Sequence, residues 1–216
     1  MKLYSYYNSS AAYRVRLALS LKGIDYQYEP INIRHQKSEE YSNYKEIINK
    51  IGFVPSLKDN DFTLSQSLAI IDFLDNKYPQ NKLIPDEPIL RARILEFSYL
   101  ICCDIHPLNN LRVLRYLLHI NKLTEKDKND WYIHWITEGF DTAESLLQEN
   151  YSVDSKWCFS DKPSLAECCL IPQVANALRV DMDISKYKRI VEVYEHAMKL
   201  PEFIKAKPEY QKDYIK

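Results

Sequence analysis

Glycine is scarce in this sequence, with only 3 glycines among 216 residues. Gly23, Gly52 and Gly139 stand too far apart to form a G-x-G-x-x-G or a G-x-x-x-x-G-K loop, so dinucleotide binding and Walker-type nucleotide binding have no support. Tight hairpins also need glycine, so a β-sandwich or β-barrel is not expected. The composition instead predicts a soluble globular protein dominated by helix.

An excess of either charge is also absent. The 29 Lys and Arg residues nearly balance the 30 Asp and Glu residues, for a net charge of -1, and no run of like charge stands out. We therefore expect no capture of nucleic acid or of an anionic membrane. The first residues are too few and too polar for a signal peptide, and no apolar run reaches the roughly 18 residues of a membrane span. These features predict a cytoplasmic protein.

Cysteine offers no metal or redox motif. The chain has five cysteines, and none of them forms a C-x-x-C pair or has a histidine at zinc-ligand spacing. We therefore expect no metal site and interpret the cysteines as small buried hydrophobic residues on helices. They are Cys102, Cys103, Cys158, Cys168 and Cys169.

The period of the hydrophobic pattern changes near residue 80. Before this point, short strand-like runs alternate with helical ones, whereas every later segment has helical spacing. This β-α-β-α-β-β-α order is typical of a small thioredoxin-like layer. The predicted elements are strand 3–7, helix 11–22, strand 26–33, helix 39–50, a hairpin over 55–64, and helix 66–77.

The later part of the chain is predicted to be all-helical, with apolar stripes near 90–101, 108–118, 136–147 and 170–177. Ser164 and Glu167 form a capping box before the last of these, and Pro172 then falls inside that helix. The predicted fold class is therefore α/β plus all-α. It comprises a thioredoxin-like domain at 1–80, a linker at 81–88 and a helical domain at 89–216.

The densest polar cluster lies between the first strand and the first helix, where Asn8 precedes Ser9 and Ser10. Two hydroxyls at a helix N-terminus can donate to an anion beside unpaired backbone N–H groups, and the helix dipole favours negative charge there. A thiolate is an anion of this kind. The alternative is that one of these serines simply caps the helix.

Two further features favour a small anionic peptide as the ligand. In a thioredoxin-like layer the proline of Val54-Pro55 is commonly cis, which leaves the Val54 peptide groups able to pair with an extended peptide. Otherwise it is an ordinary proline at a strand start. Gln66 and Ser67 open the third helix, where an amide and a hydroxyl suit a carboxylate.

These residues match a known family. Over nearly its whole length the chain closely resembles zeta-class glutathione transferases, the maleylacetoacetate isomerases. The resemblance implies the glutathione transferase fold, a homodimer, and a glutathione site on each N-terminal domain. The motifs that carry it are Ser9-Ser10 before Arg14-Val15-Arg16, Val54-Pro55, Gln66-Ser67, Pro107-Leu108-Asn109-Asn110-Leu111 and the run from Leu170 to Ala177.

The resemblance also implies roles for individual residues toward glutathione as a cofactor. Ser9 and Ser10 are implied to stabilise its thiolate, and Val54 to pair with its cysteinyl backbone. Gln66 and Ser67 are implied to hold the γ-glutamyl carboxylate. The other implied glutathione-binding positions are Ala11, Arg14, Glu40, Pro55 and Asn109.

The implied activity is the cis–trans isomerisation of maleylacetoacetate to fumarylacetoacetate in tyrosine and phenylalanine breakdown. The glutathione thiolate adds to the cis double bond, rotation follows, and elimination returns the trans isomer. Arg179 is implied to orient the dicarboxylate-like substrate, although without the match it is an ordinary solvated arginine. Transferase activity on small electrophiles is implied as a side activity.

The chain departs from the family at several of these positions. Ala11 stands where the family usually has cysteine, and Tyr13 where it has tryptophan. Glu40 would bring an acid near the glycyl carboxylate of glutathione, and Asn109 shortens a side chain that is often glutamine. Two other functions therefore stay open: conjugation of an unknown electrophile as the main activity, and a non-catalytic dimer of this fold that binds a partner.

Overall fold

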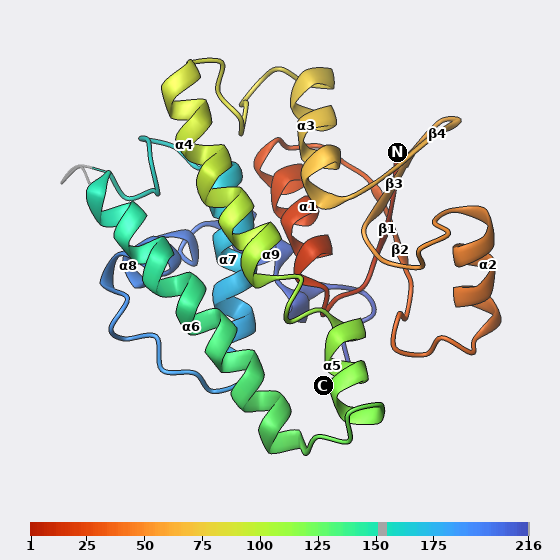
Figure 1. The fold of residues 1–216 in the computed structure, drawn as a ribbon. Coiled ribbons are helices and arrows are strands. Elements are labelled where there is room, and N and C mark those ends of the chain that lie inside the picture. Colours follow the sequence, from red (N-terminus) through yellow and green to blue (C-terminus); the bar gives the residue numbers. More distant parts are fainter. Residues whose placement is uncertain (151–154, 216) are drawn as a thin grey trace. The chain divides into compact units, whose positions relative to one another are not determined.

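Two compact units make up the chain in the computed structural model, which describes residues 1–150 and 155–215 (Figure 1). The first unit comprises Met1–Ile84 together with Met198–Lys216, and the second comprises Pro85–Ala197. The division expected from the sequence puts residues 198–216 with the helical domain, whereas in the structure they pack with the first unit.

A four-stranded sheet forms the centre of the first unit. Its strands are β1 (Lys2–Ser5), β2 (Gln27–Pro30), β3 (Ser56–Asp59) and β4 (Phe62–Ser65), in the order β2-β1-β3-β4. β1 runs parallel to β2 and antiparallel to β3, and β3 and β4 form the predicted hairpin. Leu3 lies opposite Tyr28 and Leu57, and all three side chains are buried, so this part of the sheet belongs to the core.

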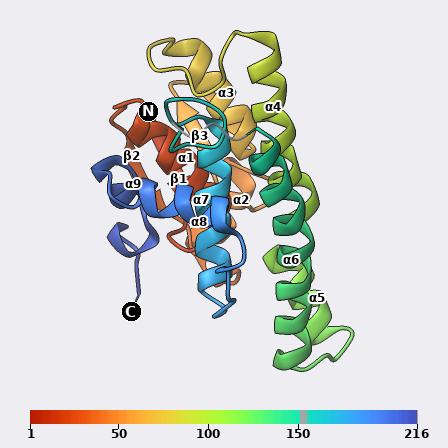
Figure 2. The same ribbon diagram turned by 90° about the vertical axis from the view of Figure 1, so that its left-hand side faces the viewer.

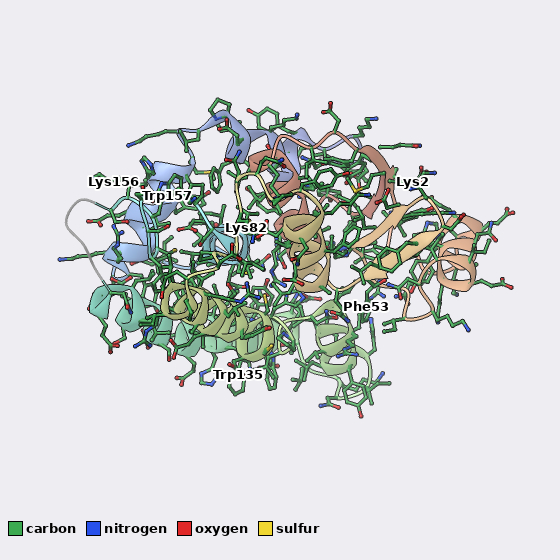
Figure 3. All side chains as sticks on the ribbon, turned by 90° about the horizontal axis from the view of Figure 1, so that it is seen from above. Lys2, Phe53, Lys82, Trp135, Lys156 and Trp157 are labelled. Atoms are coloured by element: carbon green, nitrogen blue, oxygen red, sulfur yellow. The ribbon has the colours of Figure 1, made fainter. Side chains whose placement is uncertain are left out.

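Three helices cover this sheet: α1 (Ser10–Leu21), α2 (Glu39–Ile47) and α3 (Ser67–Lys77). α1 and α3 pack against each other on one side, and α2 lies on the other side (Figure 1, Figure 3). α1 buries Val15, Leu17 and Ala18 completely. It stops where predicted, at Gly23, whose φ of 64° lies in the left-handed region that commonly ends a helix.

Helix α9 (Pro201–Ala206) packs on α1 and joins the C-terminal residues to the first unit. The buried Arg16 guanidinium donates to the Ala206 carbonyl at 3.0 Å and to the Tyr7 carbonyl at 3.1 Å. Asp213 accepts from the Tyr28 hydroxyl at 2.5 Å and from the Tyr7 N–H at 3.0 Å. These bonds between distant parts of the sequence are the physical reason that 198–216 belong to the first unit.

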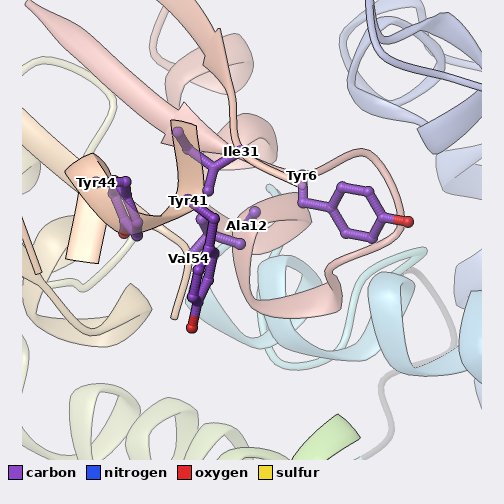
Figure 4. Packing of buried hydrophobic residues seen from close by; sticks show 6 residues of the cluster. All are labelled: Tyr6, Ala12, Ile31, Tyr41, Tyr44 and Val54. Atoms are coloured by element: carbon purple, nitrogen blue, oxygen red, sulfur yellow. The ribbon is translucent and has the colours of Figure 1, made fainter. Parts of the chain in front are cut away.

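A cluster of buried side chains packs α2 against the loops near the start of α1 (Figure 4). Tyr44 of α2 donates its hydroxyl to the Phe53 carbonyl at 2.5 Å and lies 2.8 Å from the Ser56 hydroxyl. The segment on either side of Pro55 is therefore tied to α2. The cluster consists of Tyr6, Ala12, Ile31, Tyr41, Tyr44 and Val54.

The first part of the predicted linker, 81–88, is ordered as part of the first unit. Leu83 and Ile84 are buried, and their N–H groups donate to one carboxylate oxygen of Asp75 at 2.9 and 2.6 Å. The other oxygen pairs with the buried Lys22 ammonium at 2.7 Å. A buried ion pair therefore fixes the end of the first unit.

Every regular element described in the second unit is a helix. These are α4 (Pro88–Tyr99), a π-helical segment (Leu100–Ile105), α5 (Leu111–His119), α6 (Glu125–Glu149), α7 (Leu165–Leu178) and α8 (Lys188–Ala197). α7 is almost entirely buried and contacts α4, α8 and the π-helical segment (Figure 2). Its predicted capping box is confirmed, with the Ser164 N–H donating to Glu167 at 2.7 Å, and Pro172 lies inside the helix.

No helix in the described part of the chain has the length and apolar character needed to cross a bilayer. Within residues 1–150 and 155–215, no three His, Cys, Asp or Glu side chains gather as metal ligands would.

The cysteines follow the expectation of buried, helical positions only in part. Cys103 is exposed, because Ile101 and Ile105 occupy the buried face of the π-helical segment. Cys158 is buried but lies outside the helices. Cys102 is half-buried, whereas Cys168 and Cys169 are buried on α7 as expected.

Candidate active site

Helix α1 begins at a polar turn that places both predicted serines at its N-terminus. Ser9 is the N-cap, and its Oγ accepts from the Ala12 N–H at 3.2 Å. Ser10 is the first helical residue and is 8% exposed. A hydroxyl that accepts in a cap keeps its own hydrogen, so capping is compatible with donation to an anion. The capping role of Ser9 is thus confirmed, and a role toward a thiolate stays a prediction.

Arg14 connects the first turns of α1 to the start of α3. Its Nη1 donates to the Ser67 Oγ at 3.3 Å in a buried contact. Its Nε and Nη2 are also buried, and they have no hydrogen-bond partner among the residues that the structure describes. Between the two serines and Arg14, Ala11 is half-buried and presents only a methyl group. The helix starts predicted to bind the thiolate and the γ-glutamyl carboxylate are therefore linked through one buried cation.

Gln66 enters α3 with a strained backbone, at φ 75° and ψ 116°. Residues with a side chain rarely adopt a positive φ, and those that do are concentrated at ligand-binding and active sites. The neighbouring Ser65 hydroxyl lies 2.9 Å from the Ser56 hydroxyl. This contact ties the entry to α3 to the strand that follows Pro55.

The Val54-Pro55 peptide bond is cis, as predicted. Val54 packs in the same cluster as Ala12 of α1 (Figure 4). Within residues 1–150 and 155–215, neither its N–H nor its C=O has a hydrogen-bond partner. Both groups are therefore able to pair with an extended peptide. The starts of α1 and α3 and the Val54 peptide thus meet in the first unit.

Glu40 is not joined to this group of residues. It is exposed in the first turn of α2, and no hydrogen bond or ion pair in the described chain links it to the serines, Val54 or Gln66. A cavity of ≈ 580 Å³ beside α2 contains none of the predicted glutathione-binding residues. Its lining residues are Gln36, Tyr41, Ser42, Lys45, Glu46 and Lys50.

The other two predicted residues, Asn109 and Arg179, lie in the second unit and meet at Tyr132. The Asn109 Nδ2 donates to the Tyr132 carbonyl at 2.9 Å, and the Arg179 Nη2 donates to the Tyr132 hydroxyl at 3.0 Å. Burial raises the pKa of Tyr132, and the Arg179 charge opposes this rise. The exposed Arg179 is therefore held by a buried phenol instead of being solvated on all sides.

Sequence reasoning misses Tyr132. It shares the four-residue spacing of Ile136 and Phe140, so the pattern predicts a core position, and the side chain is indeed only 5% exposed. The single signal in the sequence is a tyrosine hydroxyl on an otherwise apolar stripe, because a buried hydroxyl needs a hydrogen-bond partner.

Comparisons with known sequences agree with the predicted family. The N-terminal domain family of glutathione S-transferases matches residues 3–82. The maleylacetoacetate isomerase of Pseudomonas aeruginosa is 39% identical over 214 residues, which cover 99% of this chain and 98% of that protein.

Solved structures agree over the full length of the chain. A holo structure of maleyl pyruvate isomerase, described as a bacterial glutathione S-transferase in the zeta class, has a TM-score of 0.92 at 36% identity and covers 100% of both chains. The maleylacetoacetate isomerase of Anaeromyxobacter dehalogenans 2CP-1, with bound dicarboxyethyl glutathione and citrate in its active site, has a TM-score of 0.86 at 30% identity, covering 99% of this chain and 93% of that one. The predicted fold is confirmed, and the chain belongs to the maleylacetoacetate isomerase family, the zeta class of the glutathione S-transferases.

Proposed function

We propose that this chain is an enzyme that isomerises maleylacetoacetate to fumarylacetoacetate with glutathione as its cofactor. The observation that carries the proposal is the meeting of three polar features in the first unit: the α1 start, the Val54 peptide and the α3 start. The relatives that cover the whole chain include proteins named for this reaction.

The residues present fit a glutathione molecule. The unpaired peptide groups of Val54 suit its cysteinyl backbone, and the Gln66 amide with the Ser67 hydroxyl suits its γ-glutamyl carboxylate. The unpaired Nε and Nη2 of Arg14 leave positive charge behind Ser67, which also favours an anion. Glutathione supplies a thiolate nucleophile when it is bound.

We expect the start of α1 to keep that thiol ionised. A free thiol has a pKa of about 8.5, and each unit by which the site lowers it requires about 1.4 kcal/mol of preferential binding to the thiolate. The hydroxyls of Ser9 and Ser10 and the N-terminal end of the helix dipole both favour negative charge at this point. Ala11 contributes no polar group to this task.

Arg179 has the task of orienting the substrate. A guanidinium forms paired hydrogen bonds with a carboxylate, and its charge favours the transition state in which negative charge reaches the substrate oxygens. A relative in this family holds citrate and a dicarboxyethyl group in its active site. These ligands support a dicarboxylate-like substrate for this chain.

We further propose that the protein is a cytoplasmic homodimer in tyrosine and phenylalanine breakdown. This proposal is supported by the family resemblance. Sedimentation equilibrium tests the dimer, and a mass equal to a single chain would contradict it.

A second candidate function is conjugation of glutathione to a small electrophile as the main activity. The observation that favours it is Ala11, which stands where the family usually has cysteine. If that cysteine takes part in isomerisation, this chain is impaired in it, while thiolate formation at the serines is retained.

One assay compares the two functions. Loss of maleylacetone absorbance is followed with and without glutathione, beside conjugation of an α-haloacid under the same conditions. Isomerase turnover that requires glutathione supports the first function. Robust conjugation with no maleylacetone turnover would reject it in favour of the second.

A further inference from the structure

Arg14 and Arg16 are both buried on α1, yet their surroundings differ. Arg14 is 2% exposed and Arg16 is 1% exposed. The Arg16 guanidinium donates to three backbone carbonyls and to the Ser5 hydroxyl, so each of its nitrogen atoms has an acceptor. Among the residues that the structure describes, Arg14 donates only to the Ser67 hydroxyl, at 3.3 Å.

No carboxylate compensates the Arg14 charge in the part of the chain that the structure describes. None of the ion pairs of residues 1–150 and 155–215 includes Arg14, and its Nε and Nη2 have no hydrogen-bond partner there. A buried cation without a counter-charge is unfavourable, and native proteins normally pair such a group. Within the described residues, the positive charge directly behind Ser67 is therefore uncompensated.

We propose that the γ-glutamyl carboxylate of bound glutathione is the missing counter-charge of Arg14, and that Arg14 acts on it through Ser67. The inference rests on the glutathione site proposed above. The nitrogen atoms of Arg14 are buried, so this residue positions and polarises Ser67 and is not itself a contact of the ligand.

Hydrogen-bond polarity explains how Ser67 transmits the effect. Its Oγ accepts from the Arg14 Nη1, so its own hydrogen is left to donate elsewhere. Ser67 opens α3, where the helix N-terminus also favours an anion. A chain of donors from Arg14 through Ser67 to the carboxylate strengthens each bond in it.

Two consequences distinguish this role from ordinary packing. Without glutathione, Arg14→Met should fold with a melting temperature equal to or above that of the wild type, because it removes an uncompensated charge. With glutathione, the same variant should bind weakly. Replacing a residue that only fills space would change the melting temperature but would not change the preference for ligands that carry the carboxylate.

The test is calorimetric binding of three ligands. Glutathione is compared with γ-aminobutyryl-cysteinylglycine, which lacks the γ-glutamyl carboxylate, and with glutaryl-cysteinylglycine, which keeps the carboxylate but lacks the amine. Arg14→Met should weaken glutathione and the glutaryl ligand by about tenfold to a hundredfold, as expected for a charge-assisted hydrogen bond. It should leave the affinity for the γ-aminobutyryl ligand unchanged.

Further variants test the path through Ser67. Ser67→Ala should lose the same discrimination, and adding Arg14→Met to it should cause little additional loss, because the two residues act in series. Arg14→Lys keeps the charge, so it should restore part of the preference for the carboxylate ligands. The same variant provides the test if Arg14→Met fails to fold. Arg16→Lys is the matched control, with a lower melting temperature and unchanged ligand preferences.

The outcomes separate this inference from the proposed function. Equal weakening of all three ligands by Arg14→Met, additive losses in the double variant, or no weakening at all would each overturn the inference while glutathione binding by the wild type still stands. Failure of the wild type to bind glutathione would overturn the inference and the proposed function together.

Discussion

Replacing Ser9 by alanine distinguishes its capping of α1 from its proposed stabilisation of the glutathione thiolate. The change removes the Oγ that accepts from the Ala12 N–H, and the loss of an N-cap costs about 1 kcal/mol of folding free energy. If Ser9 also donates to the thiolate, the change removes a donor whose loss lowers kcat by about a hundredfold to a thousandfold. The expected loss of rate is therefore much larger than the loss of stability.

Two matched variants keep these effects apart. Ser9→Asp caps a helix about as well as serine but has no hydrogen to donate when it is ionised, so it should fold normally and lose activity. Ser10→Ala removes the second hydroxyl at a position that is not the cap, so the Ser9 cap of the helix is kept. The drop in rate for Ser10→Ala then measures how much of the thiolate stabilisation that hydroxyl supplies.

The assay combines maleylacetone turnover at saturating glutathione, urea unfolding, and ultraviolet titration of the thiolate in the bound complex. Measured at a pH below the pKa of the bound thiol, a hundredfold loss that arises from thiolate formation should appear as a rise of about two units in that pKa. The reasoning is refuted if Ser9→Ala, Ser10→Ala and the double variant all keep more than about a third of the wild-type rate.

Three other substitutions test the ion pair of Asp75, the hydrogen bond of Tyr132 and the strained backbone of Gln66. Asp75→Ala leaves the buried Lys22 ammonium without its counter-charge, so the free energy of unfolding in urea should fall by about 3–5 kcal/mol. A loss below about 1 kcal/mol would contradict a buried pair. Tyr132→Phe removes the hydroxyl that accepts from Arg179, so the KM for maleylacetone should rise by about tenfold in steady-state kinetics while the KM for glutathione stays constant. Equal KM values for maleylacetone in wild type and variant would exclude this contact from substrate orientation. Gln66→Gly relieves the positive φ, so stability should rise by about 1 kcal/mol while calorimetry shows weaker glutathione binding; a less stable variant would argue against strain.

Elements with local signals were predictable from the sequence. The capping box of Ser164 and Glu167 and the helix stop at Gly23 depend only on neighbours a few residues away, and the structure confirms both. α6 begins at Glu125, well before the predicted stripe at 136–147. The sequence pattern did not predict the first half of this helix because that half is polar and carries little apolar periodicity. The packing of 198–216 depends on bonds across up to 206 positions, which no local pattern encodes.

In the candidate site, too, the features with local signals were predictable and those that depend on distant contacts were not. The helix-terminal positions of Ser9 and Ser67 follow from sequence pattern and family resemblance together. The unpaired nitrogen atoms of Arg14 and the positive φ of Gln66 arise from the packing of several elements, so no window of sequence predicts them. Tyr132 was hidden because a buried tyrosine and a core hydrophobic residue share one periodicity.

The packing of residues 198–216 on α1 also has a consequence for biosynthesis. A ribosome releases residues 1–84 first, yet Arg16 cannot reach the Ala206 carbonyl until the whole helical unit has been made. The helical unit, although second in the chain, is thus the first to have all of its residues and is able to complete its fold during translation. Truncation before residue 198 should therefore damage the glutathione-binding unit at the opposite end of the sequence more than the helices next to the cut.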